Sequence, residues 1–265
     1  MGSKVKYNVF RRVWRSIPIP AQRKLKPMLM KGIAAFFKRA GYGFVDLDGL
    51  LEHLRSNGFA PRTIIDVGAF IGGWSRGAKP IFPDAYYLMI EGNEDNRARL
   101  AWSVGQVGKG EFVIALLGPE EKEEVVFHVL SKGSSVLPEL TSFDAEHRRV
   151  PMRRLDDVIA ERTLEEPILL KLDAQGFELE ILRGGRATLA RAEVVILEAS
   201  LIPYNEGAPL IAEVIAFMAE AGFVAYDIFG GHRRETDNAL YQTDIVFTRP
   251  ESVLRAKKKF WLMEE

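Results

Sequence analysis

The sequence predicts an α/β fold: a doubly wound, mostly parallel sheet of seven strands with helices on its faces. Three observations predict it. Short apolar runs alternate with helical patterns over most of the chain, which is typical of such sheets. A glycine-rich turn follows the first apolar run, between Gly68 and Gly73. The last two apolar runs, 223–228 and 243–248, are joined by a polar loop with no helical pattern, which indicates a closing antiparallel hairpin.

The composition excludes several classes of protein. The chain has 265 residues, of which 47% are hydrophobic, so it can bury a full core. It has no cysteine, which excludes disulfides, thiolate metal ligands and a cysteine nucleophile. No apolar stretch approaches the roughly 20 residues of a membrane-spanning helix. We expect a cytoplasmic protein, with peripheral attachment to the inner face of the membrane as an alternative.

Residues 1–45 differ in charge from the rest of the chain. They hold eleven Lys and Arg and no acid, whereas the remainder holds 25 basic and 36 acidic residues. Two stretches show apolar residues at helical spacing, and Pro18 and Pro20 separate them. We therefore divide the chain into a basic amphipathic helical arm, 1–45, and a globular domain, 46–265.

Two interpretations of the arm remain open. Its apolar faces can pack on the globular domain or on a second copy of the chain in a homodimer. Alternatively, the arm can bind an anionic membrane surface or a lipid-linked substrate. Nucleic acid is not an expected partner, because the acidic body would repel phosphates.

The first half of the domain alternates helices and strands. Leu50, Leu51 and Leu54 give the first helix one apolar face. The strands after it are short runs that are apolar on both faces, as in a covered parallel sheet. The expected elements are a helix at 48–57, a strand at 63–67, a helix at 72–79, a strand at 85–90, a helix at 93–103 and a strand at 111–117.

The second half is less regular before it resumes the alternation. Between 120 and 155 we expect one strand, at 124–130, and Asp156 and Asp157 favour the start of a helix at 155–162. The elements expected after it are a strand at 167–172, a helix at 177–189, a strand at 193–198, a helix at 208–221 and the strands of the closing hairpin.

Acidic residues mark the ends of four expected strands. Asp66 lies at the end of the first, and Glu91, Asp173 and Glu198 follow three others. The carboxyl ends of parallel strands meet at one edge of a sheet, where such folds bind ligands. A buried carboxylate needs a partner to offset its desolvation, so four together indicate a functional site.

The glycine-rich turn and these acids favour a cationic nucleoside cofactor. Glu91, 23 residues after Gly68, can accept both hydroxyls of a ribose. Asp66 beside the turn would repel a phosphate, whereas an acidic loop suits S-adenosylmethionine. The loop also departs from G-x-G-x-x-G at Phe70. A nicotinamide-dependent oxidoreductase on a Rossmann-like fold remains an alternative.

The chain resembles the FkbM family of S-adenosylmethionine-dependent methyltransferases over roughly residues 50–250. The segment from Leu170 to Gly184 resembles the family's hallmark motif. Further matches are Ile65 to Ala69, Gly72, Glu91, Ile196 to Glu198, Tyr204 and Asp244 to Phe247. The chain departs from the family pattern at Phe70, where asparagine is usual, and at Gly92-Asn93, where a proline is common.

The resemblance implies a methyltransferase-type, Rossmann-like version of the predicted sheet and S-adenosylmethionine as the cofactor. It implies O-methylation of a hydroxyl on a small-molecule acceptor such as a sugar, a glycan or another natural product. A nucleic-acid methyltransferase that uses the basic arm is an alternative. The chain lacks an Asn-Pro-Pro-Tyr-like motif for amino methylation and a cysteine for attack on a pyrimidine.

The resemblance also assigns roles within the site. Glu91 would hold the ribose, an apolar slot at Ala115 and Leu116 would face the adenine, and Asp173 would lie near the methionine amino group or the transferred methyl. Gly68 and Gly72 would let the backbone approach the ligand closely. The expected cofactor-binding residues are Asp66, Gly68, Ala69, Phe70, Gly72, Ser75, Glu91, Gly92, Asn93, Ala115, Leu116 and Asp173.

The acceptor hydroxyl needs a base that takes its proton. The candidates are Asp173, Glu198 and His232. The expected substrate contacts are Gln175, Glu178 and Tyr204. Structural alternatives remain for His232 as an exposed loop residue, for Tyr204 as a packed ring and for Glu178 as a partner of the helix dipole. We expect no metal site, because the other histidines show no metal-binding spacing.

Overall fold

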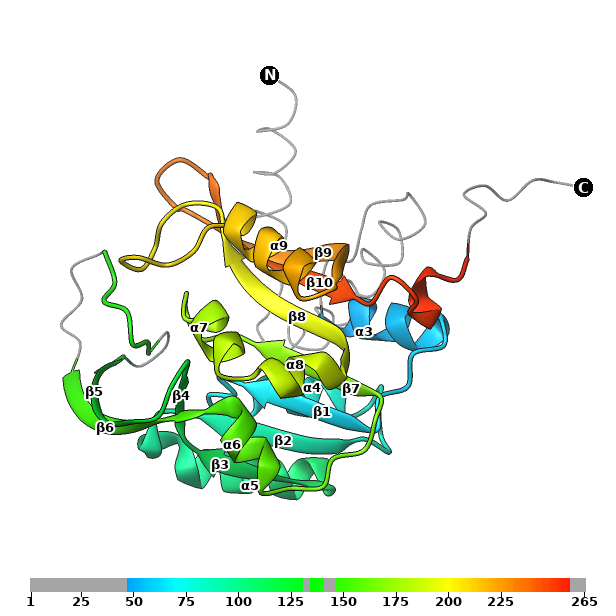
Figure 1. Cartoon of the computed structure of the whole chain (residues 1–265), viewed down its shortest axis with the longest axis horizontal. Helices are drawn as coiled ribbons and strands as arrows, with labels where there is room; N and C mark the ends of the chain where they lie inside the picture. Colours follow the sequence, from blue (N-terminus) through cyan, green and yellow to red (C-terminus); the bar gives the residue numbers. More distant parts are fainter. Residues whose placement is uncertain (1–46, 131–133, 141–145, 258–265) are drawn as a thin grey trace, which may run out of the picture. The chain divides into compact units, whose positions relative to one another are not determined.

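The computed structural model describes residues 47–130, 134–140 and 146–257 (Figure 1). The predicted helical arm, 1–45, lies outside the described residues. The main feature of the described part is a seven-stranded sheet in the order β3-β2-β1-β7-β8-β10-β9. The predicted doubly wound sheet of seven strands is therefore confirmed.

The strands of this sheet run parallel except at one edge. Strands β3, β2, β1, β7 and β8 pair in parallel, whereas β10 pairs antiparallel with both β8 and β9. The closing antiparallel hairpin is thus also confirmed, and its strands are longer than predicted. The bounds are β1 (Thr63–Val67), β2 (Tyr86–Glu91), β3 (Gly110–Ile114), β7 (Ile168–Leu172), β8 (Ala192–Ser200), β9 (Val224–Arg233) and β10 (Leu240–Thr248).

The strands carry apolar side chains on both faces of the sheet, and helices cover these faces. One core joins Ile65 and Val67 of β1 to apolar residues of the helices α6 to α9. Leu50, Leu51 and Leu54 of α3 are fully buried, and α3 contacts α4, which contacts α5. The bounds are α3 (Leu47–Ser56), α4 (Gly73–Ala78), α5 (Arg97–Val107), α6 (Leu155–Ala160), α7 (Glu178–Arg183), α8 (Arg186–Arg191) and α9 (Ile211–Glu220), with one-turn helices η1 (Glu94–Asn96) and η2 (Val253–Arg255).

A second, small sheet corrects two predictions. The expected single strand at 111–117 ends at Ile114, and the chain then enters a separate strand, β4 (Leu116–Gly118). The stretch expected to hold one strand holds two, β5 (Lys122–Val129) and β6 (Glu146–Arg154), in the sheet order β4-β6-β5. Figure 1 shows this small sheet on the β3 side of the large one, with the β9–β10 hairpin on the opposite side.

The physical reason for the second correction is the sequence of β6, which is rich in arginine and contains a proline. Only Val150 and Met152 face the small apolar core beside Phe127. The arginines on either side of these two residues are paired with acidic side chains, including Arg149 with Glu124. A strand with so few apolar residues has a weak alternating pattern, which explains why it was missed.

The helix expected at 177–189 is two helices. The break falls at Gly184-Gly185, where α7 ends and α8 begins. A Cβ at Gly184 would lie 2.1 Å from the carbonyl oxygen of Gly118, so the backbone of the break packs directly on the end of β4. This close packing requires glycine and redirects the chain.

Within the described ranges, none of the helices combines the length and the apolar character that crossing a membrane requires.

Candidate active site

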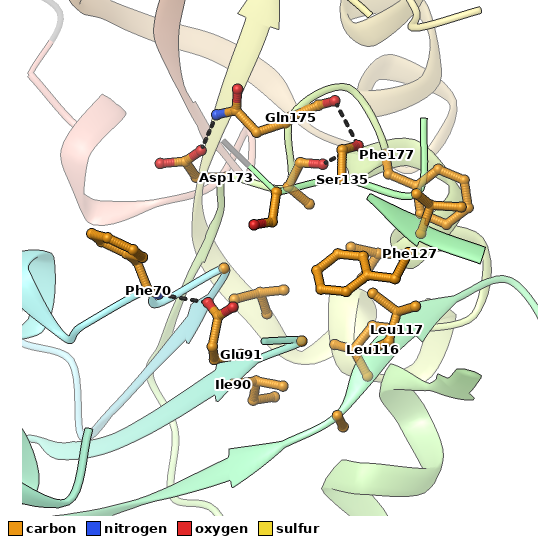
Figure 2. Close-up of a pocket in the computed structure, with 18 residues that line it drawn as sticks. Phe70, Ile90, Glu91, Leu116, Leu117, Phe127, Ser135, Asp173, Gln175 and Phe177 are labelled. Carbon is orange, nitrogen blue, oxygen red and sulfur yellow. Dashed lines mark hydrogen bonds between the residues drawn. The ribbon is translucent and has the colours of Figure 1, made fainter. Parts of the chain in front are cut away.

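A cavity of about 390 Å³ opens where β1, β2 and β7 end. The sheet order reverses between β1 and β7, and open α/β sheets bind ligands at such a switch point. Figure 2 shows Asp173 and Gln175 at the top of the cavity, the apolar residues Leu116, Leu117 and Phe127 at its lower right and Glu91 at its lower left. The cavity thus has a polar end and an apolar end.

The glycine-rich turn forms one wall. Gly68, Phe70 and Gly72 all have left-handed backbone conformations, with φ of 69°, 51° and 71°. A Cβ at Gly68 would lie 1.8 Å from the carbonyl oxygen of Asp173, so the turn touches the chain after β7. A left-handed conformation is strained for Phe70, which lines the cavity, and such strain tends to occur at functional sites.

Glu91 is fixed by the backbone on both sides. Its carboxylate Oε2 accepts the Phe70 N–H at 2.7 Å and its Oε1 accepts the Asn93 N–H at 2.8 Å. Burial raises the pKa of Glu91, and hydrogen bonds from the two N–H groups and from the Asn96 side chain oppose this rise. The carboxylate is therefore held in one orientation at the wall of the cavity.

The other predicted residues of this wall support that arrangement. Gly92 and Ala115 line the cavity, together with Leu116. Ala69 donates its N–H to the Ile90 carbonyl, which closes the turn over the end of β2. At Gly72, a Cβ would lie 2.6 Å from Cβ of Ser103, so this glycine packs on α5.

Sequence reasoning missed much of the apolar end. Phe127 of β5 and Phe177 before α7 line the cavity there, and so do Leu117, Val136 and Ile181. The alternation of Val125, Phe127 and Val129 was a signal that Phe127 faces the interior. The residues that face Phe127 across the cavity could not be found from the sequence, because the small sheet was not predicted.

Asp66 and Ser75 lie beneath the turn and do not line the cavity. Asp66 is fully buried; its Oδ2 accepts the Ser75 hydroxyl at 2.7 Å, and its Oδ1 lies 3.1 Å from Lys171 Nζ. Lys171 Nζ also lies 3.5 Å from Asp173 Oδ2. Burial opposes the charge of Lys171, but these two carboxylates outweigh it and raise the pKa of the ammonium. The sequence analysis did not single out Lys171, although a lysine within an apolar strand was a signal for a buried, paired charge.

At the polar end, an amide joins two of the predicted carboxylates. Gln175 Nε2 donates to Asp173 Oδ1 at 3.0 Å and to Glu198 Oε2 at 3.1 Å. Gln242 of β10, which the sequence did not indicate, donates to the same oxygen of Glu198 at 3.1 Å. Gln175 has a φ of 55°, a second strained position at this site.

The acids crowded here favour their neutral forms. Burial, followed by the charge of Asp173, raises the pKa of Glu198 well above its usual range. Burial and Asp173 likewise raise the pKa of Asp244 to about 7. Asp244 pairs across the sheet with Glu198. The site therefore combines a carboxylate beside an ammonium with carboxyl groups that can hold a proton near neutral pH.

Four predicted residues near the polar end do not line the cavity, namely Glu178, Tyr204, His232 and the Glu198 described above. Glu178 is buried, and its Oε1 accepts the N–H groups of Ala174 at 2.7 Å and Gly176 at 3.2 Å, so it fixes the turn after β7. Tyr204 donates to Glu139 at 3.0 Å and stacks on Tyr241, with ring centroids 5.6 Å apart. His232 is exposed on β9, 6.1 Å from the Tyr241 ring.

Two loops beside the polar end are hydrogen-bonded to each other, and we call them the paired loops, 134–140 and 201–208. Leu140 N–H donates to the Tyr204 carbonyl at 3.0 Å, and Glu206 N–H to the Pro138 carbonyl at 2.9 Å. The Ser135 hydroxyl donates to the Gln175 carbonyl at 3.2 Å, which anchors the first loop to the site. Among the described residues, no cluster of three or more acidic or histidine side chains is arranged to hold a metal ion.

A comparison with known protein families identifies the family of the chain. The model of the FkbM methyltransferase domain matches residues 66–225, which is more than half of the chain. No curated protein sequence matches the chain.

Several solved methyltransferase structures are similar at low identity. An S-adenosylmethionine-dependent methyltransferase from Clostridium acetobutylicum is 9% identical, with a TM-score of 0.45 over 83% of this chain and 99% of that one. Precorrin-6y C5,15-methyltransferase from Geobacter metallireducens is 14% identical, with a TM-score of 0.41 over 75% and 85%. An O-methyltransferase family protein from Burkholderia thailandensis is 10% identical, with a TM-score of 0.44 over 76% and 55%. Similarities this distant carry no argument about the acceptor.

Proposed function

The chain belongs to the FkbM methyltransferase family, and we propose that it transfers a methyl group from S-adenosylmethionine to a hydroxyl oxygen of a sugar, a glycan or another small natural product. One observation carries the proposal. Glu91, oriented by two backbone N–H groups, shares a cavity of about 390 Å³ with an apolar slot and a polar cluster. Glu91, the apolar slot and the polar cluster match the ribose, the adenine and the methionine parts of the cofactor, respectively.

The residues present fit that cofactor. Glu91 would accept the two ribose hydroxyls, and Leu116, Leu117 and Phe127 would enclose the flat, apolar faces of the adenine. Asp173 would lie at the methionine end, where the cofactor carries its positive charges. The volume is within the range of small-molecule sites, about 300–1,000 Å³.

The remaining chemistry is modest. S-adenosylmethionine supplies a methyl group already activated by its positively charged sulfur. The protein must align the acceptor oxygen at about 3 Å and exclude water. We assign proton acceptance to Asp173, because it lines the cavity and lies 3.5 Å from Lys171 Nζ. Neutral Glu198, whose pKa burial raises, would donate a hydrogen bond to the acceptor.

The substrate class rests on the polar groups around Gln175. Amide and carboxyl groups that both donate and accept hydrogen bonds suit an acceptor with several hydroxyls. Tyr204 and Tyr241 add a stacked aromatic pair nearby, a surface on which the C–H face of a sugar can pack. Gln175 and Tyr204 are thus our proposed substrate contacts.

Nucleic acid remains a poor candidate as acceptor. The four arginines of β6 are each paired with an acid rather than free for phosphates: Arg148 with Asp95, Arg149 with Glu124, Arg153 with Glu161 and Arg154 with Asp157. A lipid-linked glycan reached through residues 1–45, and a homodimer formed through them, remain proposals.

Calorimetric titration tests the cofactor first. We expect S-adenosylmethionine and S-adenosylhomocysteine to bind with micromolar affinity and NAD not to bind. NAD binding alone would instead support the oxidoreductase alternative, and binding of none of the three would contradict the proposed cofactor site.

An acceptor screen with methyl-labelled donor follows. Monosaccharides, lipid-linked glycans and a pool of RNA are incubated with the wild type and with Asp173→Asn, an isosteric variant that lacks the proposed base. Label on a hydroxyl-bearing acceptor that falls about 10²–10⁴-fold in the variant supports the proposal. Label on RNA only would reject the proposed acceptor class.

A further inference from the structure

A lysine lies in a buried strand of the sheet. All five residues of β7 are buried, and four of them are aliphatic, whereas Lys171 is charged and 5% exposed. A buried ammonium is costly unless acids and hydrogen-bond acceptors compensate it. Its partners therefore indicate why this strand carries a charge at all.

The ammonium lies between two carboxylates but is nearer to one. Nζ lies 3.1 Å from Asp66 Oδ1, 3.4 Å from the Gly68 carbonyl oxygen and 3.5 Å from Asp173 Oδ2. One positive and two negative charges leave an excess of one negative charge. The shorter distance assigns the lysine mainly to Asp66 and leaves that excess on Asp173.

The two carboxylates differ in access to the cavity. Asp66 is fully buried, and its second oxygen is occupied by the Ser75 hydroxyl, so it offers nothing to a ligand. The Asp173 side chain is 39% exposed and lines the cavity. A ligand at the methionine end therefore senses the excess charge through Asp173 alone.

We propose that the Asp66–Lys171 pair determines the preference of the site for the methyl donor over the demethylated product. This inference rests on the proposed function, because it assumes that both cofactor forms bind in the cavity. The donor carries a positive sulfur that the product lacks, so the two ligands differ by one unit of charge at this end. Asp66 neutralises Lys171 and thereby keeps the charge of Asp173 available to that sulfur; both are positioning residues that act through Asp173.

The test compares the ratio of the two dissociation constants, product over donor, by calorimetry at one fixed pH and salt concentration. In Asp66→Asn the lysine keeps Asp173 as its one carboxylate within 4 Å among the described residues, so the excess charge of the three groups disappears. We expect the ratio to fall about 5- to 30-fold, the effect of one charge at roughly 8 Å in a partly polar site. In the double variant Asp66→Asn, Lys171→Met, Asp173 regains its charge and the ratio should return to within about threefold of the wild type.

Ser75→Ala is the matched control, because it removes a hydrogen bond from Asp66 without changing a charge. We expect it to lower the melting temperature and leave the ratio unchanged. A purely structural pair would weaken donor and product binding equally, so an unchanged ratio in folded Asp66→Asn would overturn the inference. A double variant whose ratio still differs from that of the wild type by more than about fivefold would also overturn the inference. If Asp66→Asn does not fold, the double variant provides the deciding measurement. If the wild type binds neither ligand, the proposed function fails instead.

Discussion

Glu91 shows how the backbone prepares a single side chain for a ligand. The N–H groups of Phe70 and Asn93 fix its carboxylate, and burial makes its interactions strong. We expect Glu91→Ala to weaken S-adenosylmethionine binding by about 1–3 kcal/mol, measured by calorimetry. Glu94→Ala is the control, since Glu94 is exposed and paired with Arg97 on the surface. Equal affinities for wild type and Glu91→Ala would contradict the ribose assignment.

Glu178 should make stability depend on pH. Burial raises its pKa to about 7 in the folded protein, whereas the unfolded chain ionises near the ordinary value of 4.5. Between these values the folded state binds the extra proton, so the wild type loses stability as pH rises through this window. Glu178→Gln keeps the oxygen that accepts the Ala174 and Gly176 N–H groups and cannot ionise.

We therefore expect the stability of Glu178→Gln relative to the wild type to rise by about 1–3 kcal/mol from pH 4.5 to pH 8, measured by urea unfolding. Glu180→Gln is the control, because Glu180 lies on the same helix with its side chain 38% exposed and paired with Arg183. A pH-independent difference for Glu178→Gln would contradict the assignment.

At the scale of residues, the sequence located charges better than it located their partners. Asp66, Glu91 and Asp173 lie at or beside the carboxyl ends of their strands as predicted, whereas Glu198 lies within β8, which continues to Ser200. The pairing of Asp66 with Lys171, or of Glu198 with Gln242, depends on strands that are distant in sequence and adjacent in the sheet. No local pattern carries that information.

Among the elements, the glycine-rich turn is the most constrained. At Gly68 a Cβ would meet the Asp173 carbonyl at 1.8 Å, and φ is 69°. We expect Gly68→Ala to destabilise the protein by about 2–4 kcal/mol in denaturant unfolding. Gly105→Ala is the matched control: Gly105 lies within α5 and a Cβ there meets nothing within 4 Å. It should be neutral or stabilising, and equal losses in both variants would rule out the close approach as the cause.

The elements that were predicted correctly have strong patterns. Buried parallel strands such as β1 and β7 are short apolar runs, and the helices between them have apolar faces. The small sheet was missed because β6 is polar on most positions and its arginines are paired with acids. The apolar end of the cavity depends on that sheet. The small sheet and the apolar end therefore escaped prediction for the same reason.

At the scale of the whole molecule, the described residues contain an extensive apolar core. Its members lie between Ile65 and Phe247 in the sequence. We expect deletion of residues 1–45 to leave a cooperatively unfolding protein with unchanged S-adenosylmethionine affinity, measured by thermal unfolding and calorimetry. Aggregation of the truncated protein would instead favour packing of the arm on the domain.

The same deletion tests the membrane proposal for the arm. The wild type is expected to sediment with vesicles containing anionic lipid and not with neutral vesicles, and the truncated protein with neither. Sedimentation that survives the deletion would place lipid binding elsewhere. The architecture of the sheet, mostly parallel with an antiparallel closing hairpin, could be predicted at this scale because alternating elements and a helix-free hairpin restrict the topologies available.

The hydrogen bonds between the paired loops, 134–140 and 201–208, bear on how the acceptor range of this protein can be changed. Each loop supplies backbone partners to the other, and the Asn205 side chain donates to the Leu137 carbonyl at 3.2 Å. A graft that replaces one loop would leave the unmet donors and acceptors of its neighbour beside the polar end of the cavity. Redesign of acceptor choice therefore has to transplant the two segments together, as one cassette.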